Sequence, residues 1–192
     1  DAPTVTDVSA SDPSLEEITC LVATELTQGT TATTYSPNAS ITRRQMALFI
    51  KRTADLADEL EVTALAALPA YDGIPDFVDV VGESTEAQEA IGQLSQADIV
   101  EGTTAATYGP GQDVTRRQMA AFINRLQDFL TGDPFTTTGD YFDDDAGDPG
   151  EDNLNALASV GIFQGDGAGN VTPGGLLTRR QMANILLRDA QV

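Results

Sequence analysis

The sequence predicts a mainly α-helical protein in which three helix–loop–helix repeats pack together. Two observations carry this prediction: a hexapeptide recurs three times in register with other landmarks, and an apolar stripe at helical spacing follows each copy. Such self-similarity is the signature of a repeat architecture, because a single repeat cannot bury its apolar face alone. We therefore expect the three repeats to form one packed domain.

The hexapeptide Thr-Arg-Arg-Gln-Met-Ala marks the same point of each repeat. It occupies residues 42–47, 115–120 and 178–183. Three other positions keep a constant distance from its threonine: a glycine thirteen residues before it, a proline five residues before it and an arginine ten residues after it. In repeat order these are Gly29, Gly102 and Gly165; Pro37, Pro110 and Pro173; and Arg52, Arg125 and Arg188. Chance does not place so many landmarks in register three times.

A helix is predicted to begin at each hexapeptide. A threonine at the N-cap with glutamine three residues later is a capping box, which satisfies two backbone donors that the helix leaves without a partner. The apolar stripe that follows is most complete in the second copy, at Met119, Phe122, Ile123, Leu126 and Leu130. It recurs at Met46, Phe49 and Ile50 and at Met182, Ile185 and Leu186.

Each repeat opens with an apolar-x-Asp segment and a first amphipathic helix. The helix is clearest at Ala87, Ala90, Ile91 and Leu94, whose spacing fits one helical face. In the first repeat it runs through Ile18, Leu21 and Val22, and we expect the neighbouring Cys20 to be a small buried hydrophobe. The predicted divisions are repeat 1 at 1–52, a partly helical linker at 53–73, repeat 2 at 74–130, a loop linker at 131–140 and repeat 3 at 141–192.

The composition excludes several classes of protein. The chain has 192 residues, with 30 Asp and Glu against 10 Lys and Arg, and its net charge of −20 argues against nucleic-acid binding. No apolar run approaches the roughly 18 residues of a membrane span, so we expect no membrane insertion. The absence of histidine removes the commonest general base and zinc ligand, and a single cysteine permits no internal disulfide.

All ten cations lie in three windows, 43–52, 116–125 and 179–188, which contain no acidic residue. Two arginines in the first turn of a helix oppose its dipole, so each pair needs a negative partner. That partner is either a carboxylate of the neighbouring repeat or the carboxylate or phosphate of a ligand at the helix N-terminus. Both hold if one arginine of each pair is structural and the other binds ligand. The third arginines, Arg52, Arg125 and Arg188, are expected to serve packing or internal ion pairs.

The order and spacing of these motifs resemble the S-layer homology (SLH) domain over about residues 5 to 190. Here the family's usual Ile-Thr-Arg-Ala-Glu motif becomes a hydrophobe followed by Thr-Arg-Arg-Gln. The resemblance implies a pseudo-threefold helical bundle with ligand grooves between the repeats. It also implies a secreted, non-enzymatic module at a prokaryotic cell surface, which anchors proteins non-covalently to cell-wall polysaccharide, often one bearing pyruvylated amino sugars.

The resemblance also implies the ligand-binding residues. The ligand arginines would be Arg43, Arg116 and Arg179. The second arginines, Arg44, Arg117 and Arg180, stand where the family has a small residue and would suit a more anionic ligand. The glycines Gly29, Gly102 and Gly165 would allow close approach of the sugar. The aspartates Asp7, Asp79 and Asp144 would order the groove or hydrogen-bond the ligand.

A dense acidic cluster is the candidate metal site. Asp143, Asp145 and Asp148 supply oxygen atoms of the kind that bind Ca²⁺, although their spacing does not match an EF-hand. A solvated acidic loop is the alternative interpretation. We expect no other cofactor.

The most distinctive residues recur in every copy, which favours binding, since an active site usually breaks internal symmetry. The predicted function is therefore non-covalent anchoring of a surface protein to an anionic cell-wall polysaccharide. A second hypothesis is a structural subunit of a self-assembling surface layer or filament, in which the arginines make the subunit contacts. A third is an extracellular hydrolase in which the repeats are scaffold.

Overall fold

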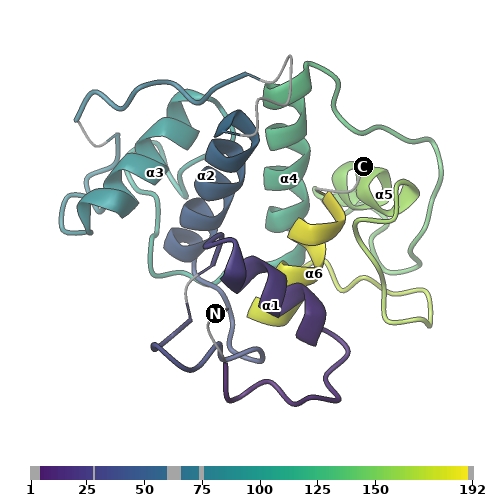
Figure 1. The fold of residues 1–192 in the computed structure, drawn as a ribbon. Coiled ribbons are helices and arrows are strands. Elements are labelled where there is room, and N and C mark those ends of the chain that lie inside the picture. The colour runs from purple at the N-terminus through teal and green to yellow at the C-terminus, as the bar shows by residue number, and fades with distance from the viewer. Residues whose placement is uncertain (1–4, 28, 60–65, 74–75, 190–192) are drawn as a thin grey trace.

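The computed structural model describes residues 5–27, 29–59, 66–73 and 76–189, and this part of the chain contains six helices and isolated β-bridges (Figure 1). The helices are α1 (Leu15–Ala23), α2 (Arg43–Glu59), α3 (Thr85–Gln96), α4 (Arg116–Thr131), α5 (Glu151–Ser159) and α6 (Arg179–Asp189). The mainly helical fold is confirmed. Within these residues, no helix combines the length and the hydropathy that crossing a membrane requires.

The predicted capping box is present at the start of α2, α4 and α6. At α4, the backbone N–H of Gln118 donates to the Thr115 hydroxyl, and the Thr115 N–H donates to the Gln118 side chain at 2.9 Å. The pairs Thr42–Gln45 and Thr178–Gln181 make the same two bonds. The hexapeptide therefore specifies where each of these helices begins.

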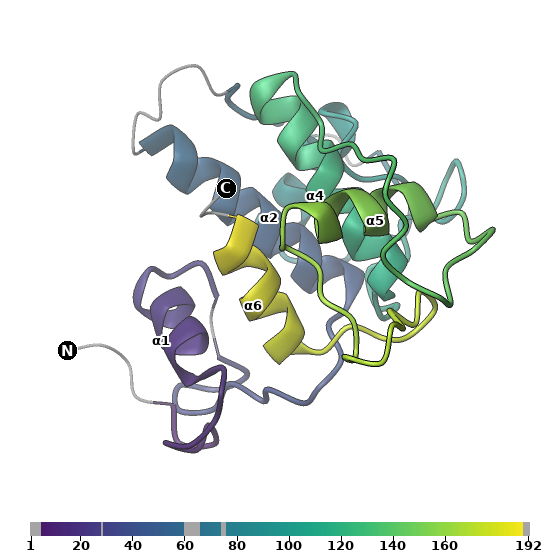
Figure 2. The same cartoon turned by 90° about the vertical axis from the view of Figure 1, so that its right-hand side faces the viewer.

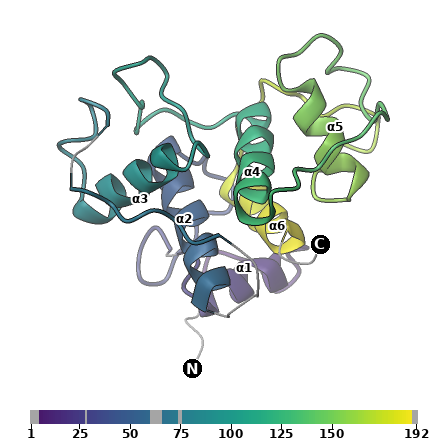
Figure 3. The ribbon, with the colours of Figure 1, turned by 90° about the horizontal axis from the view of Figure 1, so that it is seen from above.

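The strongest helix–helix contacts join different repeats. Helix α2 packs on α3, α4 packs on α5, and α6 packs on α1. Figure 2 shows the last of these pairs side by side, and Figure 3 shows α2, α4 and α6 together in the middle with α1, α3 and α5 around them. Because the first helix packs on the last, the three repeats close into a ring around one shared core.

Three backbone hydrogen bonds mark the centre of this ring. The N–H of Ile41 donates to the carbonyl of Leu177 at 3.0 Å, Leu177 donates to Val114 at 2.8 Å, and Val114 donates to Ile41 at 2.9 Å. All three side chains are fully buried. Each of these residues directly precedes a hexapeptide, so the triangle fixes the starts of α2, α4 and α6 relative to one another.

The apolar stripes predicted for the helices largely face the core. In α4, Met119, Phe122, Ile123 and Leu126 are buried, and Leu130 is partly buried against the same cluster. Helix α2 runs to Glu59 and so extends into the segment predicted as a linker, whereas α4 ends at Thr131 with Gly132 in the left-handed conformation.

The prediction for Cys20 is wrong, because this side chain is exposed. The buried face of α1 is formed by Ile18, Leu21 and Val22. Cys20 lies two residues after Ile18, which is about 200° around the helix axis. Its position next to apolar residues in the sequence therefore does not place it on their face.

Replacing Ile18 with alanine is expected to destabilise the whole domain by about 2–5 kcal/mol, because it opens a cavity under the helix that closes the ring. Denaturant unfolding, followed by far-ultraviolet circular dichroism and tyrosine fluorescence, should show one common transition at a lower midpoint. Cys20→Ala is the matched control on the exposed side of α1, with an expected change below about 0.5 kcal/mol. Separate transitions for the two probes, or equal stabilities of the two variants, would contradict the closed ring.

Candidate functional site

The first-turn amides of α2, α4 and α6 are bonded to the loop of the next repeat. At α2, Arg43 N–H donates to the carbonyl of Gln112 at 2.8 Å, and Arg44 N–H donates to that of Pro110 at 3.0 Å. The equivalent bonds join Arg116 to Gly175, Arg117 to Pro173, Arg179 to Ala39 and Arg180 to Pro37. This corrects the expectation that these amides receive a ligand anion, since carbonyl oxygens of the chain already satisfy them.

The second arginine of each pair forms an ion pair with the next repeat. The distance from a guanidinium nitrogen to a carboxylate oxygen is 2.6 Å for Arg44 and Glu83, 2.6 Å for Arg117 and Asp148, and 2.7 Å for Arg180 and Asp12. In each case the acid comes just before or at the first helix of the following repeat, with repeat 1 following repeat 3. The neighbouring-repeat alternative is thus correct for this arginine, and all three pairs strengthen the ring.

The first arginine reaches into the loop of the next repeat. The Arg43 side chain donates from Nε to the Tyr108 carbonyl at 2.8 Å and from Nη2 to the Glu101 carbonyl at 2.5 Å. Its guanidinium carbon lies 4.3 Å from the centre of the Tyr108 ring, and the Tyr108 hydroxyl donates back to the Arg43 carbonyl. Arg179 makes the same contacts with Tyr35. Both arginines are only 3% exposed.

Arg116 differs from these two arginines because Val171 replaces the tyrosine. Its Nε and Nη2 atoms donate to the carbonyls of Val171 and Gln164, and the ring of Phe163 lies 5.1 Å from its guanidinium carbon. Burial lowers the pKa of Arg116, and the charge of Asp144 opposes this, but an arginine remains charged. Without a tyrosine ring over it, the side chain is only half-buried.

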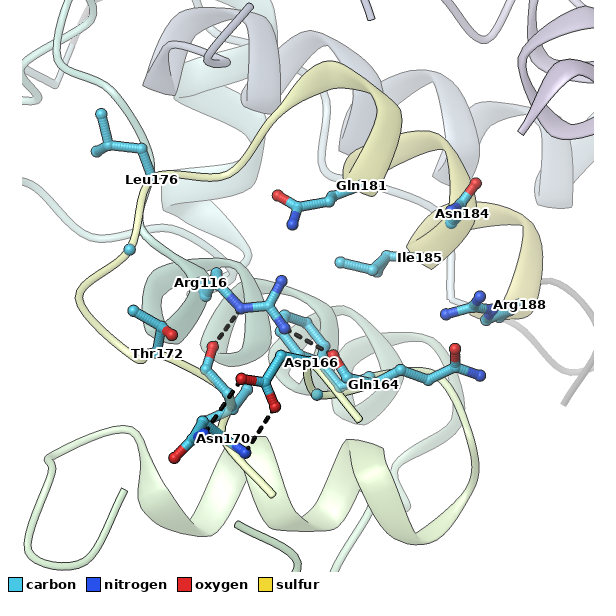
Figure 4. Close-up of a pocket in the computed structure, with 14 residues that line it drawn as sticks. Arg116, Gln164, Asp166, Asn170, Thr172, Leu176, Gln181, Asn184, Ile185 and Arg188 are labelled. Carbon is cyan, nitrogen blue, oxygen red and sulfur yellow. Dashed lines mark hydrogen bonds between the residues drawn. The ribbon is translucent and has the colours of Figure 1, made fainter. Parts of the chain in front are cut away.

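Arg116 lines a cavity of about 400 Å³ between repeats 2 and 3, which we call the 2–3 groove. In Figure 4 the Arg116 nitrogen that makes neither of these bonds points into the opening, towards the side chains that α6 contributes. The polar and charged residues that line this groove include Arg116, Gln164, Asp166, Gln181, Asn184 and Arg188.

A smaller cavity of about 230 Å³ lies at the equivalent position between repeats 3 and 1, and we call it the 3–1 groove. Its lining includes Gly29, Arg44, Gln45, Leu48, Arg52 and Arg179. The predicted ligand arginines Arg116 and Arg179 thus each line one groove. Sequence reasoning missed Gln164 and Asn184, although comparing the repeats in register reveals Asn184 where the others have Leu48 and Ala121.

The repeat glycines are required by their own loops. A Cβ atom at Gly102 would lie 2.3 Å from the Thr104 carbonyl oxygen and 2.6 Å from the Phe77 ring. At Gly29 and Gly165 it would likewise meet loop carbonyl oxygens, at 2.3 and 2.6 Å. The expectation that glycine leaves room for a sugar is therefore corrected, since the space its Cβ would fill is occupied by the loop itself.

The aspartates of the apolar-x-Asp segments hold the loops of their own repeats, and their predicted role at a ligand stays a prediction. Asp79 accepts the backbone N–H groups of Tyr108 and Gly109, each at 2.8 Å. Asp7 and Asp144 accept two successive loop amides in the same way. Burial alone would raise the pKa of Asp7 and Asp79, but these hydrogen bonds and a nearby arginine outweigh it, so the pKa of each is lowered.

The structure gives the calcium hypothesis no support. Asp148 pairs with Arg117, and the buried Asp145 accepts a bond from Asn155 at 2.9 Å. In the described part of the chain, no three Asp, Glu, His or Cys residues gather in a way that could hold a metal ion.

The third arginines are paired in two repeats of three. Arg52 lies 2.5 Å from Glu86, and Arg125 lies 2.7 Å from Glu101, as expected for internal ion pairs. Arg188 forms no ion pair with any residue that the structure describes, and it lines the 2–3 groove.

The fold and the motifs define a class of protein. The sequence pattern of the S-layer homology domain matches residues 6–47, 76–120 and 141–183, which together make up more than half of the chain. The chain therefore belongs to the S-layer homology domain family and contains three tandem repeats. Domains of this family are cell-wall anchoring modules and are not catalytic.

Three known proteins illustrate where such repeats occur. The chain is 32% identical over 126 residues to an amylopullulanase of Thermoanaerobacterium thermosulfurigenes, covering 66% of this chain and 6% of that protein. It is 33% identical to exoglucanase XynX of Acetivibrio thermocellus, covering 53% and 9%, and 35% identical to endo-1,4-beta-xylanase A of Thermoanaerobacterium saccharolyticum, covering 50% and 8%. The chain thus matches less than a tenth of the length of each.

Arg43→Ala is expected to cost about 2–3 kcal/mol of stability, because it removes two charge-assisted hydrogen bonds and leaves the buried Tyr108 carbonyl and the partly buried Glu101 carbonyl without this donor. Arg44→Ala should cost less than about 1 kcal/mol, because its ion pair is partly exposed. Urea unfolding of the two variants measures this difference. Equal losses would contradict the separate structural roles of the two neighbouring arginines.

Stability is expected to fall as the pH drops below about 4. Because the pKa values of Asp7 and Asp79 are lowered from 3.8, the unfolded chain takes up protons first, and the stabilisation is lost as the pH passes through the folded-state pKa values. Thermal unfolding between pH 2 and 6 measures this loss. The Asp79→Asn variant should be less stable than the wild type at pH 6 and should lose less stability as the pH falls. A pH profile unchanged from that of the wild type would refute the role of Asp79.

Proposed function

We propose that this chain anchors a surface protein non-covalently to an anionic cell-wall polysaccharide, such as a pyruvylated one, through its inter-repeat grooves. The observation that carries the proposal is the 2–3 groove, where a half-buried, prepositioned guanidinium faces an opening lined by amide and apolar side chains. A concave site with a few fixed polar groups is the usual form of a small-ligand site.

Arg116 has the geometry needed to bind a carboxylate. Two carbonyl oxygens fix the orientation of the guanidinium, so little side-chain entropy remains to be lost when the third nitrogen donates to an anion. A bond of this kind is charge-assisted and is about twice as strong as a bond between neutral groups. The amide of Gln164 is suited to donate to or accept from sugar hydroxyls, and the amide nitrogens of Gln181 and Asn184 are suited to donate to them.

The acidic remainder of the chain contributes selectivity. With a net charge of −20, most of the surface repels polyanions, and the arginine-lined grooves are local exceptions. An anionic polymer therefore binds only where an arginine side chain is directly accessible.

The contacts of the second arginines favour anchoring over self-assembly. The self-assembly hypothesis uses the arginines against acids of another subunit, but Arg44, Arg117 and Arg180 each pair with an acid of their own chain. For the whole protein, we infer a module that holds other domains at the cell surface. This is supported by the three named relatives, which are enzymes far longer than the region they share with this chain.

Arg116→Ala should reduce pull-down of the chain by sacculi of the source organism at least tenfold, because it removes the cation of the 2–3 groove. The matched control is Arg117→Ala, which deletes the adjacent arginine at the Asp148 ion pair and should bind like the wild type. Both variants are first checked for folding by circular dichroism.

Sacculi stripped of their acid-extractable polysaccharide should bind neither the wild type nor the variants. Equal binding to stripped and intact sacculi would refute the polysaccharide as the ligand. Equal losses in both arginine variants would refute the 2–3 groove as the site. Release of sugar from the sacculi by the chain would instead support the hydrolase hypothesis.

A further inference from the structure

The three repeats differ at one position that bears on anion binding. Counted from the hexapeptide threonine, the residue fourteen positions before it is glutamine in repeats 1 and 3 (Gln28 and Gln164) and glutamate in repeat 2 (Glu101). Gln28 lies outside the described residues. The backbone carbonyls of Glu101 and Gln164 play the same part, since each accepts a bond from the first arginine of the preceding repeat. Their side chains differ by one negative charge.

Between repeats 1 and 2, the Glu101 carboxylate forms an ion pair with Arg125, the arginine that a ligand anion would otherwise bind. Glu101 lies 2.7 Å from Arg125, whose equivalent in repeat 3 is the groove-lining Arg188. The first arginine at this interface, Arg43, is buried, and the rings of Tyr108 and Phe122 lie 4.3 and 5.6 Å from its guanidinium carbon. The chain's own carboxylate therefore stands where an anion would bind.

The 2–3 groove has the opposite arrangement. Gln164 is neutral, Arg188 has no ion pair within the described residues, and Arg116 is half-buried rather than enclosed. Among the described residues, the one acid that lines the groove is Asp166, and it is held in its own loop by Ala168 and Asn170, whose hydrogen bonds lower its pKa. Two accessible guanidinium groups thus face one cavity.

The 3–1 groove is intermediate. Its volume is about 230 Å³, whereas that of the 2–3 groove is about 400 Å³. The Nη2 atom of its Arg52 already lies 2.5 Å from the Glu86 carboxylate. Arg179 is as buried as Arg43. The third cation of this groove, Arg44, pairs with Glu83, so each of the three is either buried or in an ion pair.

We propose that the 2–3 groove is the principal anion site, with Arg188 as its second cation, and that Glu101 acts as a built-in competitor that keeps anions out of the interface between repeats 1 and 2. This inference rests on the proposed anchoring function and adds which groove is occupied and why. The Glu101 and Arg125 side chains are 72% and 37% exposed, so the competition is electrostatic and open to screening by salt.

The test uses two single variants of the whole chain, Glu101→Gln and Gln164→Glu, each of which carries the side chain that the other position has in the wild type. The probe is polysaccharide released from the sacculi and fractionated to short fragments, titrated at low ionic strength. Binding is followed by the side-chain Nε–H nuclear magnetic resonance signals of Arg116, Arg125 and Arg188, assigned with arginine-to-lysine variants. These signals report each position separately.

In the wild type, the signals of Arg116 and Arg188 should shift while that of Arg125 stays in place. In Glu101→Gln the Arg125 signal should also shift on titration, and raising the salt concentration should make the wild type and this variant more alike. In Gln164→Glu the affinity at the 2–3 groove should fall at least tenfold. Without probe, Glu101→Gln alone should move the Arg125 signal, which confirms the ion pair in solution.

The inference and the proposed function fail in distinguishable ways. Two outcomes would overturn the inequality of the grooves and leave anchoring in place, provided that the probe binds the wild type. One is an Arg125 signal that does not shift when Glu101→Gln is titrated. The other is a Gln164→Glu variant that binds the probe as tightly as the wild type does. An Arg125 signal that ignores Glu101→Gln in the absence of probe also overturns the built-in competitor. If neither the wild type nor Glu101→Gln binds the probe, both proposals are overturned.

Discussion

The docking of each hexapeptide onto the loop of the next repeat is the interaction on which the rest of the structure depends. Here the two unpaired amides at the start of a helix, together with the first arginine side chain, meet a set of loop carbonyl oxygens. Both the helix end and the loop would otherwise carry buried polar groups without partners, which costs several kcal/mol for each docking site. The loop can present its carbonyls because an aspartate holds two of its amides.

Because the interaction always points to the following repeat, three copies close into a ring. The helix pairs α2–α3, α4–α5 and α6–α1 and the ion pairs of the second arginines run in the same direction. This arrangement explains why two cations are tolerated in the first turn of each helix. Carboxylates and carbonyl oxygens of the next repeat compensate the charge that the helix dipole disfavours.

The grooves are by-products of this docking, and small departures from the repeat pattern make them unequal. Each groove lies beside a docked arginine, so its character depends on what covers that arginine. Tyrosine covers it in two repeats and Val171 leaves it partly open in the third, while Glu101 adds a charge where Gln164 is neutral. The residues shared by all three repeats thus hold the fold together, and the side chains that differ between repeats make the grooves different.

The sequence by itself determined the three repeats, the starts of the second helices and most of their buried faces, because capping boxes and helical periodicity are local. It also identified the repeated arginines and aspartates as candidate functional residues. Only the tertiary structure decided which arginine is buried, paired or open to a groove, and which face of α1 carries Cys20. Those outcomes depend on contacts between residues far apart in the chain, such as Arg180 with Asp12, and neither spacing nor composition specifies such contacts.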